Sequence, residues 1–297
     1  MTMETEKGTL GQYLAYMPQA ALLGLARALP YRARLAFGAR FLRTAVAVVP
    51  DLRRRVEENL RLIFPEMPPE ERTRIRAAMA DSFGRTFIEV FSLAAFQRHA
   101  AWSEPTGPGW DALQAALAEG RGALLVGGHF GQWEAVRGAL KARGIEVGAL
   151  YRPVKNPFLE RDYFRNLSTG GTPMLARDRR GIRDLVRHLR GNGVAAILLD
   201  QYVHGGAPID FLGHPAPTGL TIAELALKYG LPMIPAYGTR AADGEHVVVD
   251  LEAPIPHTTA REMTQVAADS LAARIRATPE QYYWLHRRWV KDFGRRG

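Results

Sequence analysis

An unbroken apolar run that ends in two glycines and a histidine constrains this chain more than any other feature. The stretch reads Ala123-Leu-Leu-Val-Gly-Gly-His129-Phe-Gly-Gln-Trp-Glu134. Its first residues show no helical or alternating period, which is typical of a strand buried on both faces of a parallel sheet. From Trp133 onward apolar residues recur every three to four positions, which predicts a helix. His129 is therefore expected at the carboxyl end of an inner strand, in the crevice where open α/β sheets bind ligands.

Downstream, short apolar runs alternate with amphipathic segments, which predicts an α/β fold with a mainly parallel central sheet flanked by helices. Further strands are predicted at 147–151, 173–176, 194–199, 209–212, 232–237 and 247–251, the last two joined by an Asp243-Gly244 turn. Helices are predicted after an Asp51 N-cap, at 68–91, 110–118, 158–167, 218–229 and 262–275, and from 178 or 179 through 189. We divide the chain into an N-terminal helical region, 1–50, and an α/β domain, 51–297.

The first fifty residues resemble an interfacial anchor in composition. Residues 8–26 carry no charge, but Gly11, Pro18 and Gly24 make them a poor membrane span, and we expect a helix interrupted near Pro18. No secretory signal is recognisable. Residues 31–49 form a basic amphipathic helix, and such a helix beside a weakly apolar one favours peripheral membrane association. Packing of both helices on the domain as ordinary scaffold is the alternative.

The chain of 297 residues has a formal net charge of +9 and no cysteine. There is thus no disulfide framework and no Cys-ligated metal site. The positive charge suits an anionic lipid surface or an acidic carrier protein, or it serves solubility alone. Nucleic acid is not expected as a partner, because aromatic and basic residues do not interleave in a recognition pattern.

Several motifs, in order, resemble one enzyme family. His129 and Glu134 have the His-x-x-x-x-Asp/Glu spacing of the glycerolipid acyltransferases, and the string from Gly128 to Glu134 resembles the subgroup of lipid A late acyltransferases and mycobacterial phosphatidylinositol mannoside acyltransferases. Further blocks similar to this subgroup are Asn59-Leu-Arg-Leu-Ile-Phe-Pro65, Tyr151-Arg-Pro153, Asp200-Gln201, Phe211-Leu-Gly213 followed by Thr218, and Tyr283-Trp-Leu-His-Arg-Arg288. The resemblance covers roughly Asn59 to the end.

This resemblance implies a transferase that moves a fatty acyl chain from a thioester of acyl carrier protein or coenzyme A to a hydroxyl of a glycolipid or lysophospholipid. It implies no metal and no cofactor beyond that co-substrate. The expected partners are a membrane lipid acceptor and an anionic surface, at the cytoplasmic face of the inner membrane. Two rival functions are a soluble α/β hydrolase and a non-catalytic basic protein that binds membrane lipid.

The predicted catalytic residues are His129, Glu134 and Asp200. Acyl transfer to an alcohol needs a base for the hydroxyl proton, and imidazole has a suitable resting pKa. Were residues 129–134 helical, steps of about 100° would place Glu134 about 140° around the axis from His129. Asp200 follows a strand expected beside the His129 strand. We therefore predict that Asp200 assists His129 and that Glu134 fixes the turn or the substrate.

The predicted substrate-binding residues are Gly128, Phe130, Gly131, Arg152, Arg177 and Gln201, with core packing as the favoured alternative for the Phe130 side chain. Glycines at 127 and 128 would let a substrate approach the backbone. Backbone N–H groups around Phe130 to Gln132, or Arg152, could stabilise the thioester oxyanion, while arginines near strand ends could clamp phosphate or carboxylate.

The remaining residues weighed for function carry weaker signals. With no cysteine and no serine in a nucleophile-elbow pattern, direct transfer is favoured over an acyl-enzyme. Glu89, in an apolar helix stripe, is expected to be structurally paired. Arg180 and the run from His286 to Arg288 are expected at the surface, although the resemblance also implies a carrier or headgroup contact for the run.

Overall fold

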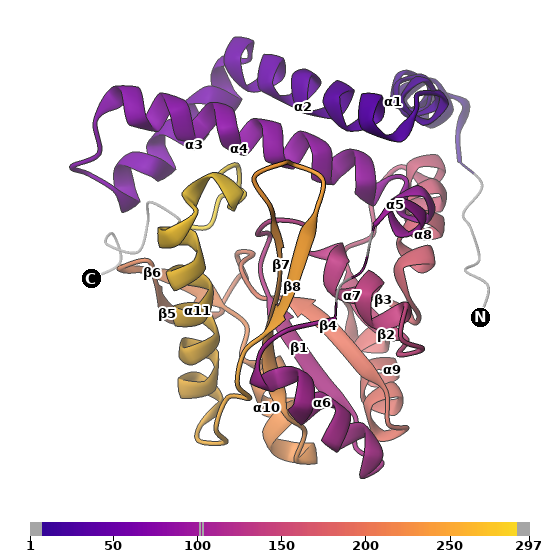
Figure 1. Ribbon diagram of the computed structural model, residues 1–297, viewed down its shortest axis with the longest axis vertical. Helices are drawn as coiled ribbons and strands as arrows, with labels where there is room; N and C mark the ends of the chain where they lie inside the picture. The colour runs from indigo at the N-terminus through magenta and orange to yellow at the C-terminus, as the bar shows by residue number, and fades with distance from the viewer. Residues whose placement is uncertain (1–7, 101, 103, 290–297) are drawn as a thin grey trace.

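The strand that ends before His129 lies inside a six-stranded sheet in the computed structural model, which describes residues 8–100, 102 and 104–289 (Figure 1). The strand order is β3-β2-β4-β1-β7-β8. The strands are β1 (Ala123–Gly127), β2 (Val147–Tyr151), β3 (Met174–Ala176), β4 (Val194–Leu198), β7 (Met233–Arg240) and β8 (Val247–Leu251). All neighbours are parallel except the β7–β8 hairpin, so the prediction of a mainly parallel sheet is confirmed.

Both faces of the sheet are covered by helices, which is why β1 is continuously apolar. Leu125 of β1 packs into one core cluster, whereas Leu124 and Val126 pack into another on the opposite face. The first cluster is shared with α6 (Pro108–Ala118), α7 (Glu134–Lys141) and α8 (Pro157–Gly170). The second is shared with α9 (Arg179–Arg190), α10 (Thr221–Tyr229) and α11 (Ala260–Ala277).

The N-terminal helices form a layer across the edge where β1 and β7 end (Figure 1). They are α1 (Leu10–Ala28), α2 (Tyr31–Val48), α3 (Pro50–Ile63), α4 (Pro69–Val90) and α5 (Leu93–His99). Among the described residues, we found no helix with the length and apolarity that crossing a membrane requires.

Two predicted details of these helices were wrong. α1 runs through Pro18 without a break. The carbonyl of Leu14, which the proline leaves without its helical donor, belongs to a residue that is 60% exposed, where water can replace the donor. α3 begins at Pro50 with Val49 as its N-cap, so Asp51 lies within the first turn.

A small hairpin of β5 (Ala207–Phe211) and β6 (His214–Thr218) stands apart from the main sheet. Its tight turn places both Leu212 and Gly213 at positive φ, as two-residue hairpin turns of the primed type do. β6 was not predicted, because Pro215 and Pro217 are poor strand residues. The helix predicted to begin at Thr218 therefore begins at Thr221.

The last described segment, residues 282–289, follows the short 3₁₀ turn Pro279–Gln281 and lies against the loop after β1, where Tyr282 forms an isolated bridge with Phe130. The Tyr283 N–H donates to the His129 carbonyl at 3.1 Å. The Asn59 side chain of α3 donates to the carbonyls of Trp284 and His286 at 2.6 and 3.0 Å. The N-terminal layer and the C-terminal segment thus meet at His129.

Candidate active site

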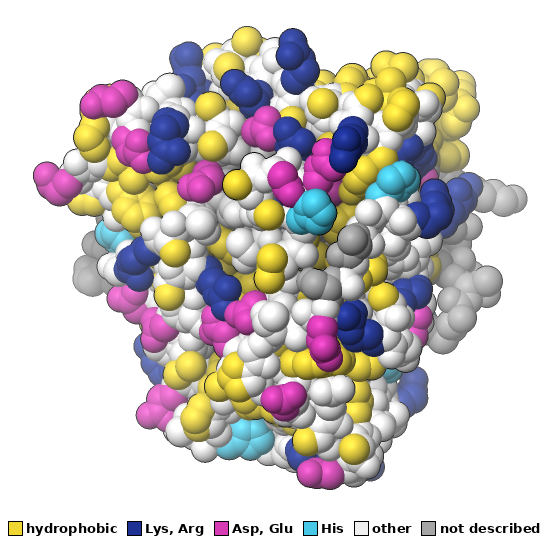
Figure 2. Space-filling view, viewed as in Figure 1, with side chains coloured by type: hydrophobic (Ala, Val, Ile, Leu, Met, Phe, Trp, Pro, Cys, Tyr) yellow, Lys and Arg dark blue, Asp and Glu magenta, His cyan; other side chains and the backbone are white. Residues whose placement is uncertain are grey.

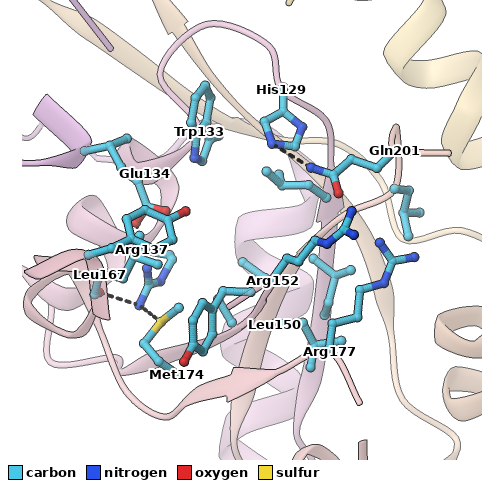
Figure 3. A pocket seen from close by; sticks show the side chains of 18 of the residues that line it. His129, Trp133, Glu134, Arg137, Leu150, Arg152, Leu167, Met174, Arg177 and Gln201 are labelled. Carbon is cyan, nitrogen blue, oxygen red and sulfur yellow. Dashed lines mark hydrogen bonds and ion pairs between the residues drawn. The ribbon is translucent and has the colours of Figure 1, made fainter. Parts of the chain in front are cut away.

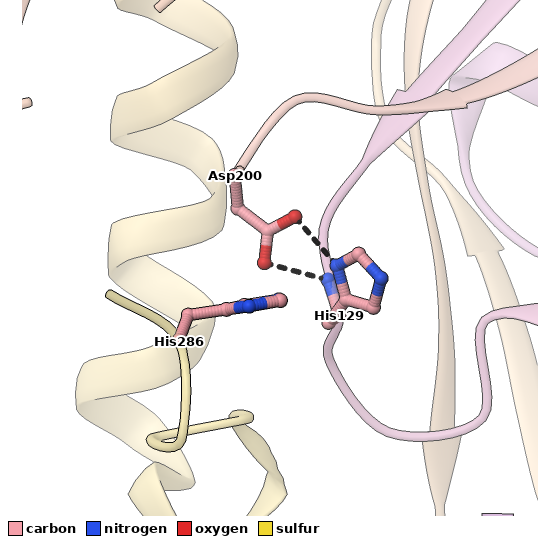
Figure 4. A group of neighbouring side chains, drawn as sticks. All are labelled: His129, Asp200 and His286. Carbon is pink, nitrogen blue, oxygen red and sulfur yellow. Dashed lines mark hydrogen bonds and ion pairs between the residues drawn. The ribbon is translucent and has the colours of Figure 1, made fainter. Parts of the chain in front are cut away.

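Strand register brings His129 and Asp200 together. Gly127 at the end of β1 is paired with Leu198 at the end of the adjacent strand β4, and each of the two residues lies two positions further along its chain. The Asp200 carboxylate accepts from His129 twice, from ring Nδ1 at 2.9 Å and from the backbone N–H at 2.9 Å (Figure 4). The same carboxylate therefore holds both the ring and the backbone of the histidine.

Asp200 determines which ring nitrogen carries the proton. Burial alone would raise the pKa of this fully buried carboxyl, but the charge and hydrogen bonds of His129 outweigh it and hold the pKa well below its usual range. The ionised carboxylate can only accept, so His129 Nδ1 is the donor, and in the neutral imidazole the lone pair lies on Nε2. The Gln201 side-chain amide faces that atom, with Nε2 to Nε2 at 3.5 Å.

A second imidazole, that of His286, stands edge-on to His129 with ring centroids 4.6 Å apart. Burial lowers the pKa of His286 to about 4, with Asp200 opposing and His129 reinforcing that shift. His286 is therefore neutral at physiological pH. The sequence prediction of a surface location was right for Arg287, which is exposed, but wrong for His286, which is half-buried, and for Arg288, which is 1% exposed.

Arg288 is buried, and its guanidinium is hydrogen-bonded to the loop that follows β4 and to β6. It donates to the carbonyls of Pro217 at 2.7 Å and Gln201 at 3.1 Å, and to the Thr218 hydroxyl at 2.6 Å. Three blocks that are distant in the sequence thus meet on one side chain. Contacts of this kind leave no local pattern, and only the family resemblance had marked these blocks as related.

The backbone N–H groups of the loop after His129 are hydrogen-bonded within the protein. The N–H groups of Phe130, Gly131 and Gln132 donate to the carbonyls of Gly128, Gln281 and Gly238 at 2.7, 2.7 and 2.8 Å. These are the groups suggested by the sequence as oxyanion donors, and this prediction is corrected: their hydrogen atoms are already committed within the protein. The Phe130 side chain is also buried in the core.

The glycines of this loop make room for protein atoms. A Cβ on Gly128 would lie 2.4 Å from the Leu271 side chain and 3.1 Å from the Asp200 carboxyl carbon. Gly131 has a φ of +54°, and a Cβ there would meet the Gly238 carbonyl oxygen at 2.1 Å. Neither residue, nor Phe130, lines the cavity described below. Their predicted contact with substrate is replaced by a role in packing the loop.

Glu134 begins α7 and points away from His129, toward Arg137. Its carboxylate accepts from Arg137 Nη1 at 2.7 Å, and both side chains are buried. The same guanidinium donates to the carbonyls of Val147, Leu167 and Gly171. In the described structure Glu134 has a structural partner, in agreement with the prediction that Asp200 is the residue beside His129.

One interaction that organises the site lies behind the loop. Glu89 of α4, fully buried, pairs with Arg240 of β7 and accepts from Gln132 Nε2 at 2.6 Å. The expectation of structural pairing for Glu89 is confirmed. Gln132 also accepts from the Glu134 N–H at 3.0 Å, a bridging role that nothing in the sequence indicated.

A cavity of about 650 Å³ opens beside His129. Apolar side chains form much of its wall, including Phe87, Val90, Phe91, Leu150 and Leu159. In Figure 3, Arg152, Arg177 and Gln201 lie on one side of it, and Glu134, Arg137, Leu167 and Met174 lie on the opposite side. The cavity therefore has a cationic end and an end closed by the buried ion pair.

Arg152 and Arg177 are the predicted substrate-binding residues at the cationic end. Both are exposed, and neither guanidinium has an ion-pair partner among the described residues. Arg177 directly follows β3, and its backbone N–H donates to the Tyr151 carbonyl at 2.9 Å. Guanidinium groups in this position can bind a phosphate or carboxylate bidentately.

The side chains of His129, Asp200 and His286 could also offer ligand atoms to a metal ion, because the three atoms lie within 4.8 Å of one another. Such an ion would compete with the proton on His129 Nδ1 for Asp200. The set of two imidazoles and one carboxylate suits zinc chemically, but the two hydrogen bonds that hold His129 would be disturbed.

Comparisons with known proteins agree with the motifs. The family model described as bacterial lipid A biosynthesis acyltransferase matches residues 3–291. The phosphatidylinositol mannoside acyltransferase of Mycobacterium tuberculosis is 27% identical over 80% of this chain and 77% of its own. For the lipid A biosynthesis lauroyltransferase of Escherichia coli the values are 29%, 79% and 78%, and for its palmitoleoyltransferase 28%, 84% and 84%. The resemblance stated from the motifs is thereby confirmed.

Proposed function

The chain belongs to the bacterial lipid A biosynthesis acyltransferase family and is an O-acyltransferase, and from this premise we propose that it transfers a fatty acyl group from a thioester to a glycolipid hydroxyl with His129 as general base. Membership of the family supports a glycolipid acceptor. The observation that carries the catalytic assignment is the His129–Asp200 pair, which leaves the lone pair of Nε2 beside an apolar cavity.

The reaction follows from this geometry. The acceptor hydroxyl gives its proton to His129 Nε2 while its oxygen forms a bond to the thioester carbonyl carbon. The tetrahedral intermediate then collapses, the C–S bond breaks, and the departing thiolate takes the proton from the imidazolium. Asp200 stabilises the imidazolium and keeps its Nδ1 as the donor. Both substrates bind together, so an acyl-enzyme is not needed.

The oxyanion needs donors other than the loop N–H groups. The Gln201 amide, 3.5 Å from His129 Nε2, and the Arg152 guanidinium in the same cavity are the groups we assign to it. Arg177 is assigned to an anionic group of either substrate. The acyl chain is assigned to the wall formed by Phe87, Val90 and Phe91, where burial of each methylene contributes about 0.8 kcal/mol.

Peripheral membrane association through α1 and α2 completes the proposal. Large apolar side chains on these helices are exposed, among them Leu10 at 73%, Leu14 at 60% and Phe41 at 52%. Figure 2 shows hydrophobic and basic side chains mixed along this surface, the composition of a face that lies in the lipid headgroup region. We place the enzyme at the cytoplasmic face of the inner membrane, where acyl carrier protein or coenzyme A thioesters are the donors.

The test is mass spectrometry of a membrane glycolipid extract after incubation with purified protein and a palmitoyl thioester. We expect a glycolipid whose mass has increased by one palmitoyl group. His129→Gln should form none of it while it still binds vesicles as the wild type does. Product formation by His129→Gln would contradict the base assignment. A wild-type protein that binds vesicles without acylating lipid would favour the non-catalytic binder, and one that only hydrolyses soluble esters would favour the hydrolase.

A further inference from the structure

The outer face of α9 carries a stripe of exposed arginines. Arg179, Arg183, Arg187 and Arg190 are all exposed, and their spacing places them within about 80° around the helix axis. Leu185 and Leu189 occupy the opposite side and are buried against the sheet. The stripe is therefore a surface that packing within the chain does not use.

Little of this charge is neutralised by the protein itself. Arg187 pairs with Asp184 at 2.7 Å but remains 80% exposed. Asp178 is used as the N-cap of the helix, where it accepts from the Gly181 N–H. Arg179, Arg183 and Arg190 have no ion-pair partner among the residues that the structure describes.

The stripe begins at the mouth of the catalytic cavity. Arg177 and Asp178, which directly precede α9, line that cavity. From there α9 runs toward the end of the molecule opposite α1 and α2 (Figure 1). A partner bound along α9 could thus reach the cavity without occupying the surface assigned to the membrane.

The stripe differs from α1 and α2 in lacking exposed apolar side chains. None of the large hydrophobic residues that are exposed in the described structure belongs to α9. Its apolar residues Ile182 and Val186 pack against the core cluster below. A membrane-surface helix needs apolar side chains that enter the lipid, so the stripe fits a polar, acidic partner better.

We propose that the α9 arginine stripe is the docking surface for an acidic carrier protein, which presents the acyl thioester to the cavity. This inference rests on the proposed function. One phosphate is satisfied by one or two guanidinium groups, whereas arginines spread over about 16 Å of helix match an extended acidic face. Such charge complementarity accelerates encounter and orients the partner.

The experiment compares two triple variants with the same change in net charge. Arg183→Glu/Arg187→Glu/Arg190→Glu reverses the stripe. Arg53→Glu/Arg54→Glu/Arg276→Glu is the control, made at exposed positions of α3 and α11. The pair is matched further because Arg54, like Arg187, has an i,i+3 ion pair with an aspartate. Thermal melts establish that both variants fold.

Binding of fluorescently labelled palmitoyl-acyl carrier protein is measured by anisotropy, and binding of vesicles containing phosphatidylglycerol by sedimentation. We expect the stripe variant to bind the carrier at least tenfold more weakly than the control does, with vesicle binding and turnover of palmitoyl-coenzyme A retained. The proposal is overturned by equal carrier binding of the two variants, by loss of vesicle binding alone, or by a wild type that does not bind the carrier.

The proposed function can fail separately from the docking surface. If the wild type transfers palmitoyl from neither donor, the assignment of acyl transfer from thioesters is wrong. The anisotropy measurement still decides whether the stripe binds the carrier, because it does not depend on turnover. A stripe variant that loses transfer from coenzyme A as strongly as from the carrier would contradict the docking role.

Discussion

Two buried carboxylates near the loop after β1 have different partners, one a histidine and the other an arginine. Asp200, 71 positions from His129, holds the imidazole through two hydrogen bonds. Glu134, only five positions away, is bound to Arg137 and closes the far end of the cavity. Strand register places Asp200 level with His129, whereas the start of α7 turns Glu134 away. Proximity in the sequence therefore does not identify the carboxylate that contacts the imidazole of His129.

The two carboxylates are expected to affect different properties, the rate of the reaction and the stability of the fold. Asp200 touches the imidazole that we propose as the base, so its charge should affect the chemical step. Glu134 compensates a buried cation, so its charge affects the folded state. Replacement by the amide of the same shape should therefore mainly reduce activity at Asp200 and mainly reduce stability at Glu134.

The largest effect is expected from Asp200→Asn. The amide cannot stabilise an imidazolium, and it can hold His129 in the wrong tautomer, so kcat should fall by about 10³-fold or more. Acyl transfer per folded molecule is the measurement, with circular dichroism to establish folding. Activity within tenfold of wild type would contradict the assignment of Asp200.

Glu134→Gln should mainly destabilise the fold. Loss of one partner leaves the Arg137 charge, 2% exposed, without its carboxylate, which should cost about 3 to 5 kcal/mol in urea unfolding. The folded fraction should transfer acyl groups at a rate within about tenfold of wild type. Glu71→Gln, in an exposed i,i+3 pair with Arg74, is the control and should unfold as the wild type does. A fully stable Glu134→Gln variant with the lower rate of Asp200→Asn would reverse the two roles.

The pH dependence of folding stability tests whether His286 is buried beside His129. In the unfolded chain this imidazole takes up a proton near pH 6.5, whereas burial holds its folded pKa at about 4. The unfolded state thus binds more protons between these values, and stability falls as pH falls. Wild type should lose roughly 3 kcal/mol more than His286→Gln between pH 7 and pH 4. Parallel stability curves would show that His286 is not buried as described.

The smallest effect concerns the membrane surface rather than the catalytic pair. Leu14→Ser removes one exposed apolar side chain of α1 and should weaken vesicle binding about tenfold, with the rate on a detergent-dispersed acceptor unchanged. Val266→Ser, at an apolar position on α11 that is 45% exposed, serves as the control. Equal vesicle binding by the two variants would indicate that α1 does not enter the lipid.

Local sequence patterns were sufficient to predict much of this fold. The apolar runs located β1, β2 and β4 to within a residue, because strands buried on both faces have few other solutions. The pairing of His129 with Asp200 followed from the expectation that their strands are neighbours. For Phe130 the structure agrees with the packing alternative, because its N–H group and side chain are both used within the fold.

Other parts of the site depend on contacts between distant segments. The position of His286 beside His129 depends on Asn59, more than two hundred residues earlier, which holds the C-terminal segment. Arg288 can be buried because two carbonyl oxygens and one hydroxyl oxygen accept hydrogen bonds from its guanidinium. A run of charged residues in the sequence carries no sign of such partners, so its ordinary interpretation is a solvated surface.

The central claim is that Asp200 holds the proton of the neutral His129 ring on Nδ1, so that Nε2 is the basic atom. Nitrogen-15 NMR of histidine-labelled protein measures this directly, with His129 assigned by loss of its signals in His129→Gln. We predict that the neutral ring carries its proton on Nδ1 and none on Nε2, a tautomer unchanged by Glu134→Gln and altered by Asp200→Asn. A proton found on Nε2, or a spectrum that responds to Glu134→Gln and not to Asp200→Asn, would contradict the account.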